Sequence, residues 1–218
     1  ADRLRLCKVR FAEYEAPIDV VCGAPNARVD CKFPFATVGA SLPGGVKIRR
    51  SKIRGVESNG MLCSAVELGL GDESDGILQL PDDAPIGVTI EDYLQLVDHA
   101  IEIELTPNRG DCLSIAGIAR EVGVLNRIDV NGPDIQPVPA TITDTFPVTL
   151  ESPADCPRYL GRVIRGIDPS ARTPIWMVER LRRSGIRAIS PTVDVTNYVM
   201  MELGQPMHAF DLNRLNGG

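Results

Sequence analysis

Histidines are scarce in this sequence: two occur in 218 residues, and no two of its six cysteines form a Cys-x-x-Cys pair. Structural zinc sites usually take their ligands in such close pairs, so the sequence argues against zinc and predicts no metal site. No apolar run approaches the roughly 18 to 20 residues that a membrane-spanning helix needs, which predicts no membrane partner. The glycine patterns of P-loop and Rossmann nucleotide sites are also missing.

The cysteines are widely spaced along a chain of ordinary apolar content, 44%. An even number of cysteines leaves disulfides open as an alternative, but wide spacing in a chain of this size favours reduced thiols in a cytoplasmic protein. The residues concerned are Cys7, Cys22, Cys31, Cys63, Cys112 and Cys156.

The charge balance is acidic, with a formal net charge of -6 and a sequence pI of about 5.0, which argues against a dedicated nucleic-acid coat. One segment departs from it, because residues 46–54 carry five cations and no acid: Lys47, Arg49, Arg50, Lys52 and Arg54. They fit a solvated edge strand and a phosphate-contacting stripe equally well. In either case we expect them to face solvent, because burying five unpaired cations would be prohibitively costly.

Residues 1 to about 90 have a β-rich pattern. Short apolar runs at 3–11, 18–22, 33–38 and 46–53 alternate with glycine and proline, as at Pro43-Gly44-Gly45. Several short strands separated by turns predict a small all-β barrel rather than βαβ units.

The clearest helical pattern spans residues 112–126, where Ile115, Ile118, Val122 and Leu125 would form one apolar, packed face. Asp111 is placed to cap its start, and Arg109 could form an ion pair between modules. The proline-rich stretch 131–153 predicts a linker.

The last part of the sequence predicts a strand at 158–167, then a helix that begins at Thr173-Pro174 and ends with three arginines before Gly185. A short helix at 197–203 would be capped by Thr196 and stopped by Gly204 and Pro206. A lone histidine such as His208, beside Met207 and near Phe210, is most often structural, and no nucleophile of a catalytic triad is evident nearby.

Three segments, in this order, resemble one family, the bacterial phenylalanyl-tRNA synthetase beta subunits: KIRGVESNGMLCS at 52–64, TPNRGDCLSIAGIARE at 106–121 and DVTNYVMMELGQPMHAFD at 194–211. The resemblance implies an α+β multidomain protein. Residues 1–90 would form an OB-fold β-barrel of the tRNA-binding type, whose first strand we expect to precede Ala1. Residues 91–147 would form a small α/β connector with a helix and a proline-rich linker. Residues 148–218 would form the start of an α+β editing module of the B3/B4 type, truncated at its end.

The resemblance also implies a function. The family ligates phenylalanine to tRNA(Phe) with ATP and Mg²⁺, neither bound by this stretch, as a cytoplasmic heterotetramer of two alpha and two beta chains. It further implies that Lys47, Arg49, Arg50, Lys52 and Arg54 contact tRNA. His208, Asn197 and Thr196 would form part of an editing pocket that hydrolyses mischarged tyrosyl-tRNA, with the remaining pocket residues beyond Gly218. The alternatives are a free-standing OB-fold tRNA-binding module and a stand-alone aminoacyl-tRNA hydrolase.

Overall fold

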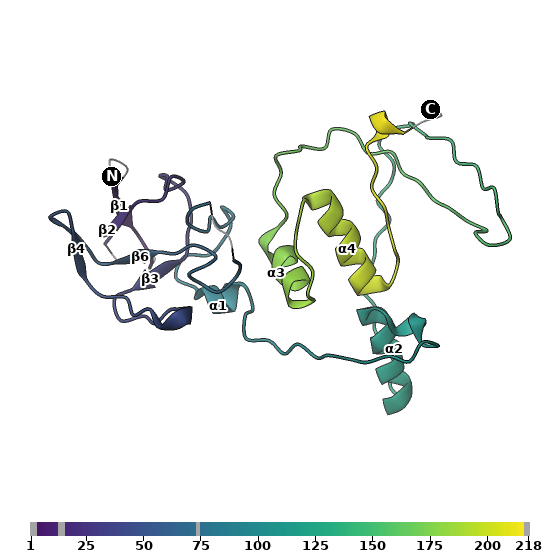
Figure 1. The fold of residues 1–218 in the computed structure, drawn as a ribbon, viewed down its shortest axis with the longest axis horizontal. Helices are drawn as coiled ribbons and strands as arrows, with labels where there is room; N and C mark the ends of the chain where they lie inside the picture. The colour runs from purple at the N-terminus through teal and green to yellow at the C-terminus, as the bar shows by residue number, and fades with distance from the viewer. Residues whose placement is uncertain (1–3, 13–15, 73–74, 216–218) are drawn as a thin grey trace. The chain divides into compact units, whose positions relative to one another are not determined.

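The chain folds as an α+β protein in two compact units, Ala1–His99 and Ala100–Gly218, which we describe separately. A computed structural model describes residues 4–12, 16–72 and 75–215 (Figure 1). The first unit carries all the strands of this described part and the short helix α1 (Ile90–Tyr93). The second carries α2 (Ile115–Asn126), α3 (Ile175–Arg183) and α4 (Pro191–Leu203).

The first unit is built from three antiparallel strand pairs. They join β1 (Arg5–Val9) to β2 (Ile18–Cys22), β3 (Phe35–Thr37) to β6 (Gly60–Leu62), and β4 (Ser51–Ile53) to β5 (Val56–Ser58). The expected β-rich N-terminal part is therefore present, with shorter strands than the sequence pattern suggested. A closed barrel stays a prediction, since the strands of the described residues hydrogen-bond only as these pairs.

Single hydrogen bonds and side-chain packing, rather than further strand ladders, join the pairs to one another. The N–H of Val21 on β2 donates to the Oγ of buried Ser58 on β5 at 3.0 Å, and the N–H of Asn59 donates to the carbonyl of Asp19 at 2.9 Å. Two small apolar cores result: one formed by Val20, Cys22, Ala27, Leu62 and Ile77, the other by Ala36, Ile48 and Cys63.

Because Cys63 is buried in the second core, we expect its thiol to react slowly. All six cysteines are free, Cys63 is buried and Cys156 is exposed. Burial raises the pKa of the Cys63 thiol to about 11, and only thiolates react readily with alkylating reagents. At pH 8 we expect iodoacetamide to modify Cys156 and to spare Cys63 until urea unfolds the chain, as read by peptide mass spectrometry. Equal labelling of both in the native protein would contradict this packing.

The basic segment is not one continuous strand over 46–53 as the sequence suggested. Lys47 forms an isolated bridge with Ser41, and β4 begins only at Ser51. The reason is the turn η1 (Pro43–Gly45), which brings residues 46–48 back against 39–42. Arg54 and Gly55 then form the two-residue turn between β4 and β5, both with positive φ, as a type I′ hairpin requires.

The start of α2 differs from the prediction that Asp111 caps it. The cap is Ser114, whose buried Oγ accepts the N–H of Gly117 at 2.9 Å. Asp111 lies one short helical turn earlier, in η2 (Gly110–Cys112), where its carboxylate pairs with Arg109 instead. The helix therefore begins at Ile115, three residues later than expected.

The predicted apolar face of α2 is not packed within the described residues, so that prediction was wrong. Ile115, Val122 and Leu125 are 65%, 46% and 73% exposed, and Ile118 alone of the four is half-buried. Instead, two buried glycines of the helix face neighbouring residues. Gly117 lies against the backbone of Asp111 and Cys112, whereas Gly123 lies against Ile128 and Val130. Close approach of backbone, which only glycine permits, positions this helix.

Gly117→Ala should therefore destabilise the protein, although alanine is ordinarily the better helix former. A Cβ at this position would overlap the backbone oxygen of Asp111 and lie 2.8 Å from the Cα of Cys112. Overpacking of this kind typically costs about 1–3 kcal/mol, which exceeds the roughly 1 kcal/mol that alanine gains over glycine in a helix. Urea unfolding measures the difference, with Arg120→Ala at an exposed position of the same helix as the control. A stabilised Gly117→Ala protein would refute the close contact.

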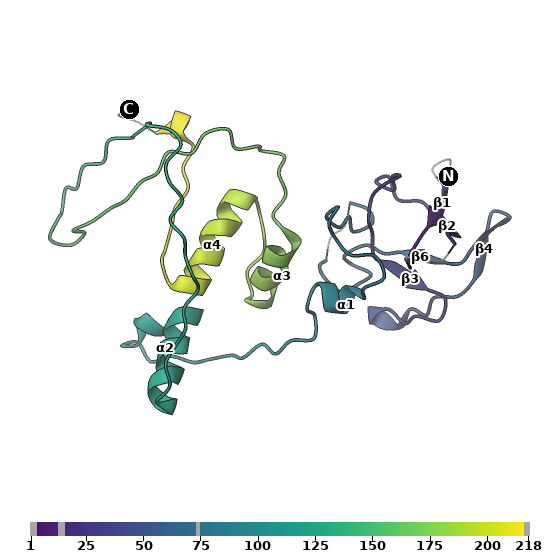
Figure 2. The same ribbon diagram turned by 180° about the vertical axis from the view of Figure 1, so that it is seen from behind.

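Helices α3 and α4 lie side by side and form the other packed part of the second unit (Figures 1 and 2). Three arginines occupy the last turn of α3 and Gly185 follows with φ of 76°, as predicted. The helix begins at Ile175, however, and Thr173 is not its cap.

Two further predictions in this unit were wrong. Residues 158–167 form no strand. Helix α4 begins at Pro191 after Ser190, so Thr196 lies inside it rather than capping it. Val193 and Val195 extend the apolar pattern toward Pro191 and are compatible with this earlier start, while Gly204, with φ of 78°, ends the helix as expected. None of the described helices is long and apolar enough to cross a membrane.

Candidate nucleic-acid interface

The five cations of the basic segment, Lys47, Arg49, Arg50, Lys52 and Arg54, are all exposed, which confirms that they face solvent. Four of them, all except Arg54, make no ion pair or side-chain hydrogen bond with any described residue. Their charges are therefore available to an external anion. The dense positive charge sits on a chain that is acidic overall, so its field is local.

One buried side chain fixes this segment to the first unit. Ile48 is 7% exposed and packs with Ala36 and Cys63. Its N–H donates to the carbonyl of Ala40 at 2.8 Å, and its carbonyl accepts the N–H of Gly39 at 2.9 Å. With Ile48 held inward, the neighbouring Lys47 and Arg49 are held at the surface.

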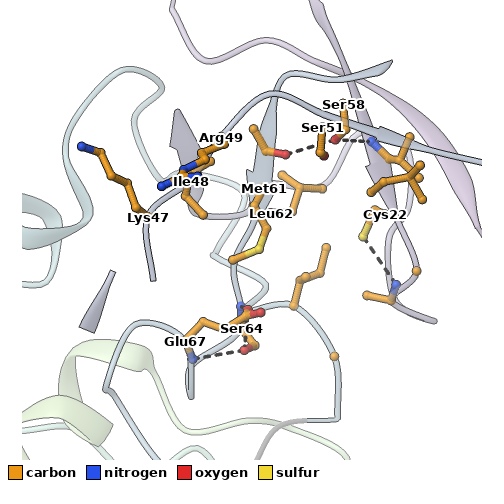
Figure 3. Close-up of a pocket in the computed structure, with 17 residues that line it drawn as sticks. Cys22, Lys47, Ile48, Arg49, Ser51, Ser58, Met61, Leu62, Ser64 and Glu67 are labelled. Atoms are coloured by element: carbon orange, nitrogen blue, oxygen red, sulfur yellow. Dashed lines mark hydrogen bonds between the residues drawn. The ribbon is translucent and has the colours of Figure 1, made fainter. Parts of the chain in front are cut away.

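A cavity of about 430 Å³ lies beside the basic segment (Figure 3). Its walls come from β2, from residues 47–53, from β5 and β6, and from three short loop stretches at 23–24, 64–67 and 76–77. The lining mixes apolar side chains with hydroxyls, as ligand pockets do. The lining residues include Lys47, Arg49, Ser51, Ser58, Met61 and Glu67.

The polar side chains that line the cavity differ in whether they already have hydrogen-bond partners. Ser58 is buried; its Oγ accepts the N–H of Val21 and donates to the carbonyl of Gly60 at 3.2 Å. The Glu67 carboxylate accepts the N–H and the hydroxyl of Ser64, at 2.6 and 2.7 Å. Ser51, by contrast, is exposed, and its hydroxyl has no partner among the described residues.

The three residues of the expected editing pocket lie in the second unit and are not joined to one another. Thr196, inside α4, donates its hydroxyl to the carbonyl of Val193 at 2.7 Å. Asn197 follows it on α4 and is half-buried. His208 lies on the extended segment after α4, exposed, with its ring centroid 6.3 Å from that of Phe210. No hydrogen bond within the described part of the chain links His208 to Thr196 or Asn197.

Asp194 has a structural role that sequence reasoning missed. It is fully buried at the start of α4. One carboxylate oxygen accepts the hydroxyl of Thr173, which precedes α3, and the other accepts the N–H of Ile189 at 2.8 Å. An acid in the first turn of a helix is a recognisable pattern, but its partner 21 residues away is not visible in the sequence.

An aromatic and cationic cluster on α3 and α4 was also missed. The guanidinium of Arg180 lies 5.3 Å from the ring centre of Trp176 and donates to the hydroxyl of Tyr198 at 2.7 Å. Trp176 and Tyr198 meet edge to face, with centroids 5.3 Å apart. The Trp176–Arg180 spacing of four residues predicts a pair on one helix face, whereas Tyr198 comes from another helix. This cluster braces α3 against α4.

Arg109 pairs within its own unit, so the expectation of an ion pair between modules was wrong. Its guanidinium contacts the Glu121 carboxylate at 2.5 Å and the Asp111 carboxylate at 3.2 Å. Hydrogen bonding from Arg109 lowers the pKa of both acids. The pair ties η2 to α2, which is a structural role. The described residues also contain no group of three or more His, Cys, Asp or Glu side chains placed to hold a metal ion.

Comparison with known proteins finds one family match in each unit. Residues 1–89 match the family model of a putative tRNA binding domain, and residues 155–218 match that of a B3/4 domain. The chain therefore carries a tRNA-binding domain followed by a B3/4 domain.

The similar proteins are phenylalanine–tRNA ligase beta subunits. Those of Pectobacterium atrosepticum and Idiomarina loihiensis are 62% and 61% identical over 217 residues, and that of Coxiella burnetii is 56% identical over 218 residues. Each match covers 100% of this chain and 27% of the relative, so the chain spans about a quarter of their length. At this identity along its whole length, the chain is homologous to that quarter of the phenylalanine–tRNA ligase beta subunits.

Proposed function

We propose that the chain serves as part of the beta subunit of an ATP-dependent phenylalanine–tRNA ligase. Identity of 62% along the whole chain to a protein of that name carries this proposal. In it, the chain works in the cytoplasm within a heterotetramer of two alpha and two beta subunits, and its macromolecular substrate is tRNA(Phe). In the same proposal, ATP and Mg²⁺ would be bound by other parts of the enzyme.

The first unit would contact the tRNA through its basic segment. Four exposed cations without partners, held outward by buried Ile48, suit the phosphate backbone. Such contacts are sequence-independent and position the RNA rather than select it. The match of residues 1–89 to a putative tRNA binding domain supports this role.

The second unit would contribute part of a proofreading pocket that hydrolyses mischarged tyrosyl-tRNA. An exposed imidazole such as His208 can hydrogen-bond a water or the ester. The amide of Asn197 and the hydroxyl of Thr196 supply further polar groups on α4. The remaining groups come from other parts of the subunit, so we expect the 218-residue chain alone to hydrolyse no tyrosyl-tRNA.

Aminoacylation tests the proposed function. The full-length beta subunit that contains this chain is purified with and without its alpha partner and mixed with tRNA(Phe), ATP and radiolabelled phenylalanine. We expect charging only when both subunits and ATP are present. A correctly folded, assembled pair that charges no tRNA, or that charges another amino acid better, would refute the assignment. Two matched domains on one chain argue against the free-standing module and the stand-alone hydrolase.

A further inference from the structure

The cavity beside the basic segment has the size and lining of a binding site. Its volume of about 430 Å³ falls within the roughly 300–1,000 Å³ of typical ligand pockets. Met61 supplies an apolar wall, and the Ser51 hydroxyl supplies a hydrogen-bonding group with no partner among the described residues. A flat, partly polar group fits these surroundings better than a purely apolar one does.

Positive charge sits at one side of the same cavity. Lys47 and Arg49 both line it and are both exposed and unpaired within the described chain. In Figure 3 the Lys47 side chain extends away from the other labelled lining residues, so its ammonium lies at the edge of the group. Among the described residues of the lining the only acid is Glu67, which already accepts two hydrogen bonds from Ser64. A bound molecule should therefore carry its negative charge on the part near Lys47 and Arg49 and be uncharged in the part that enters the cavity.

We propose that this cavity accepts one unstacked base of a single-stranded RNA segment, while Lys47 and Arg49 hold the phosphates on either side of it. A nucleotide has the required division into a neutral, flat base and an anionic backbone, and proteins commonly read single-stranded RNA by taking up splayed bases. The inference deepens the proposed tRNA contact of the basic segment and rests on it. It adds a base-binding subsite to contacts that would otherwise be made to phosphates alone.

A filled cavity tests the proposal without changing any charge. Ser51→Leu places a larger side chain at an exposed position of the lining, and Ser170→Leu makes the same change at an exposed serine of the other unit, outside the lining. Binding of a labelled single-stranded RNA of about 10 nucleotides to the 218-residue chain is followed by fluorescence anisotropy over a range of salt concentrations. Thermal unfolding confirms that both variants are folded.

We expect Ser51→Leu to weaken binding about tenfold, the loss typical of one base contact, with an unchanged salt slope, because the phosphate contacts remain. Ser170→Leu should bind as the parent chain does. An RNA in which every nucleotide is abasic should bind the parent chain as weakly as normal RNA binds Ser51→Leu.

Other outcomes overturn the inference in distinguishable ways. If the abasic RNA binds the parent chain as tightly as normal RNA, the basic segment contacts phosphates but the cavity takes no base. If no RNA binds at low salt, the proposed tRNA contact fails as well. If polyglutamate displaces the RNA at equal charge concentration, the site recognises an acidic peptide rather than a nucleotide.

Discussion

Replacing His208 with alanine in the assembled ligase is expected to slow hydrolysis of tyrosyl-tRNA by about 10²–10⁴-fold, the usual loss for one acid–base group. Phenylalanine activation should stay nearly unchanged. The side chain is exposed on the segment after α4 and makes no hydrogen bond with a described residue, so its removal should leave the local fold intact. Deacylation and activation are measured in parallel on the same preparation.

The protein offers a matched control for this substitution. His99, the other histidine, is exposed in the first unit, and His99→Ala should change neither assay. A loss nearer tenfold or below at His208, the weight of about 1 kcal/mol for a neutral hydrogen bond, would indicate that the imidazole binds substrate without transferring a proton. No loss at all would make His208 an ordinary structural residue and would refute its editing role.

Asp194→Ala should be the most destabilising substitution in the second unit, costing about 3 kcal/mol in the free energy of unfolding. The carboxylate is fully buried and accepts from the Thr173 hydroxyl and the Ile189 N–H. Truncation leaves both donors unsatisfied inside the protein and also loses the link between the segments that precede α3 and α4. Urea unfolding monitored by Trp176 fluorescence reports on this region.

Asp211→Ala provides the comparison, because Asp211 also accepts a backbone N–H, that of Asn213, but has a side chain that is 54% exposed. We expect it to cost less than about 1 kcal/mol, as water replaces the lost partner. Asp194→Asn retains one acceptor oxygen and should fall between the two. Equal costs for the two alanine variants would show that burial of Asp194 contributes nothing.

Local sequence patterns predicted the structure well where the backbone conformation depends mainly on the residue itself and its immediate neighbours. Gly185 and Gly204 both adopt the positive φ expected after a helix, and the residues 18–22 form a strand as their apolar run suggested. The exposure of the basic segment follows equally directly from the cost of burying charge.

Features that depend on distant partners could not be predicted. Asp111 is a residue type that commonly caps helices, but its carboxylate pairs with Arg109, which also pairs with Glu121. Ser114 caps the helix instead. The apolar spacing of Ile115, Val122 and Leu125 predicted burial, yet the glycines of α2 determine which side approaches the rest of the unit. The cavity likewise arises from residues on four strands and their loops.

The contact between the basic segment and tRNA is the central claim, and the salt dependence of tRNA(Phe) binding tests it most directly. The parent chain is compared with Arg50→Gln/Lys52→Gln and with Arg10→Gln/Arg28→Gln, which removes the same charge from exposed positions outside the segment. We predict that the first pair lowers the slope of log K against log salt by up to about two units, whereas the second leaves it close to that of the parent chain. An unchanged slope for Arg50→Gln/Lys52→Gln, or an equal drop for both pairs, would contradict a phosphate contact at this segment.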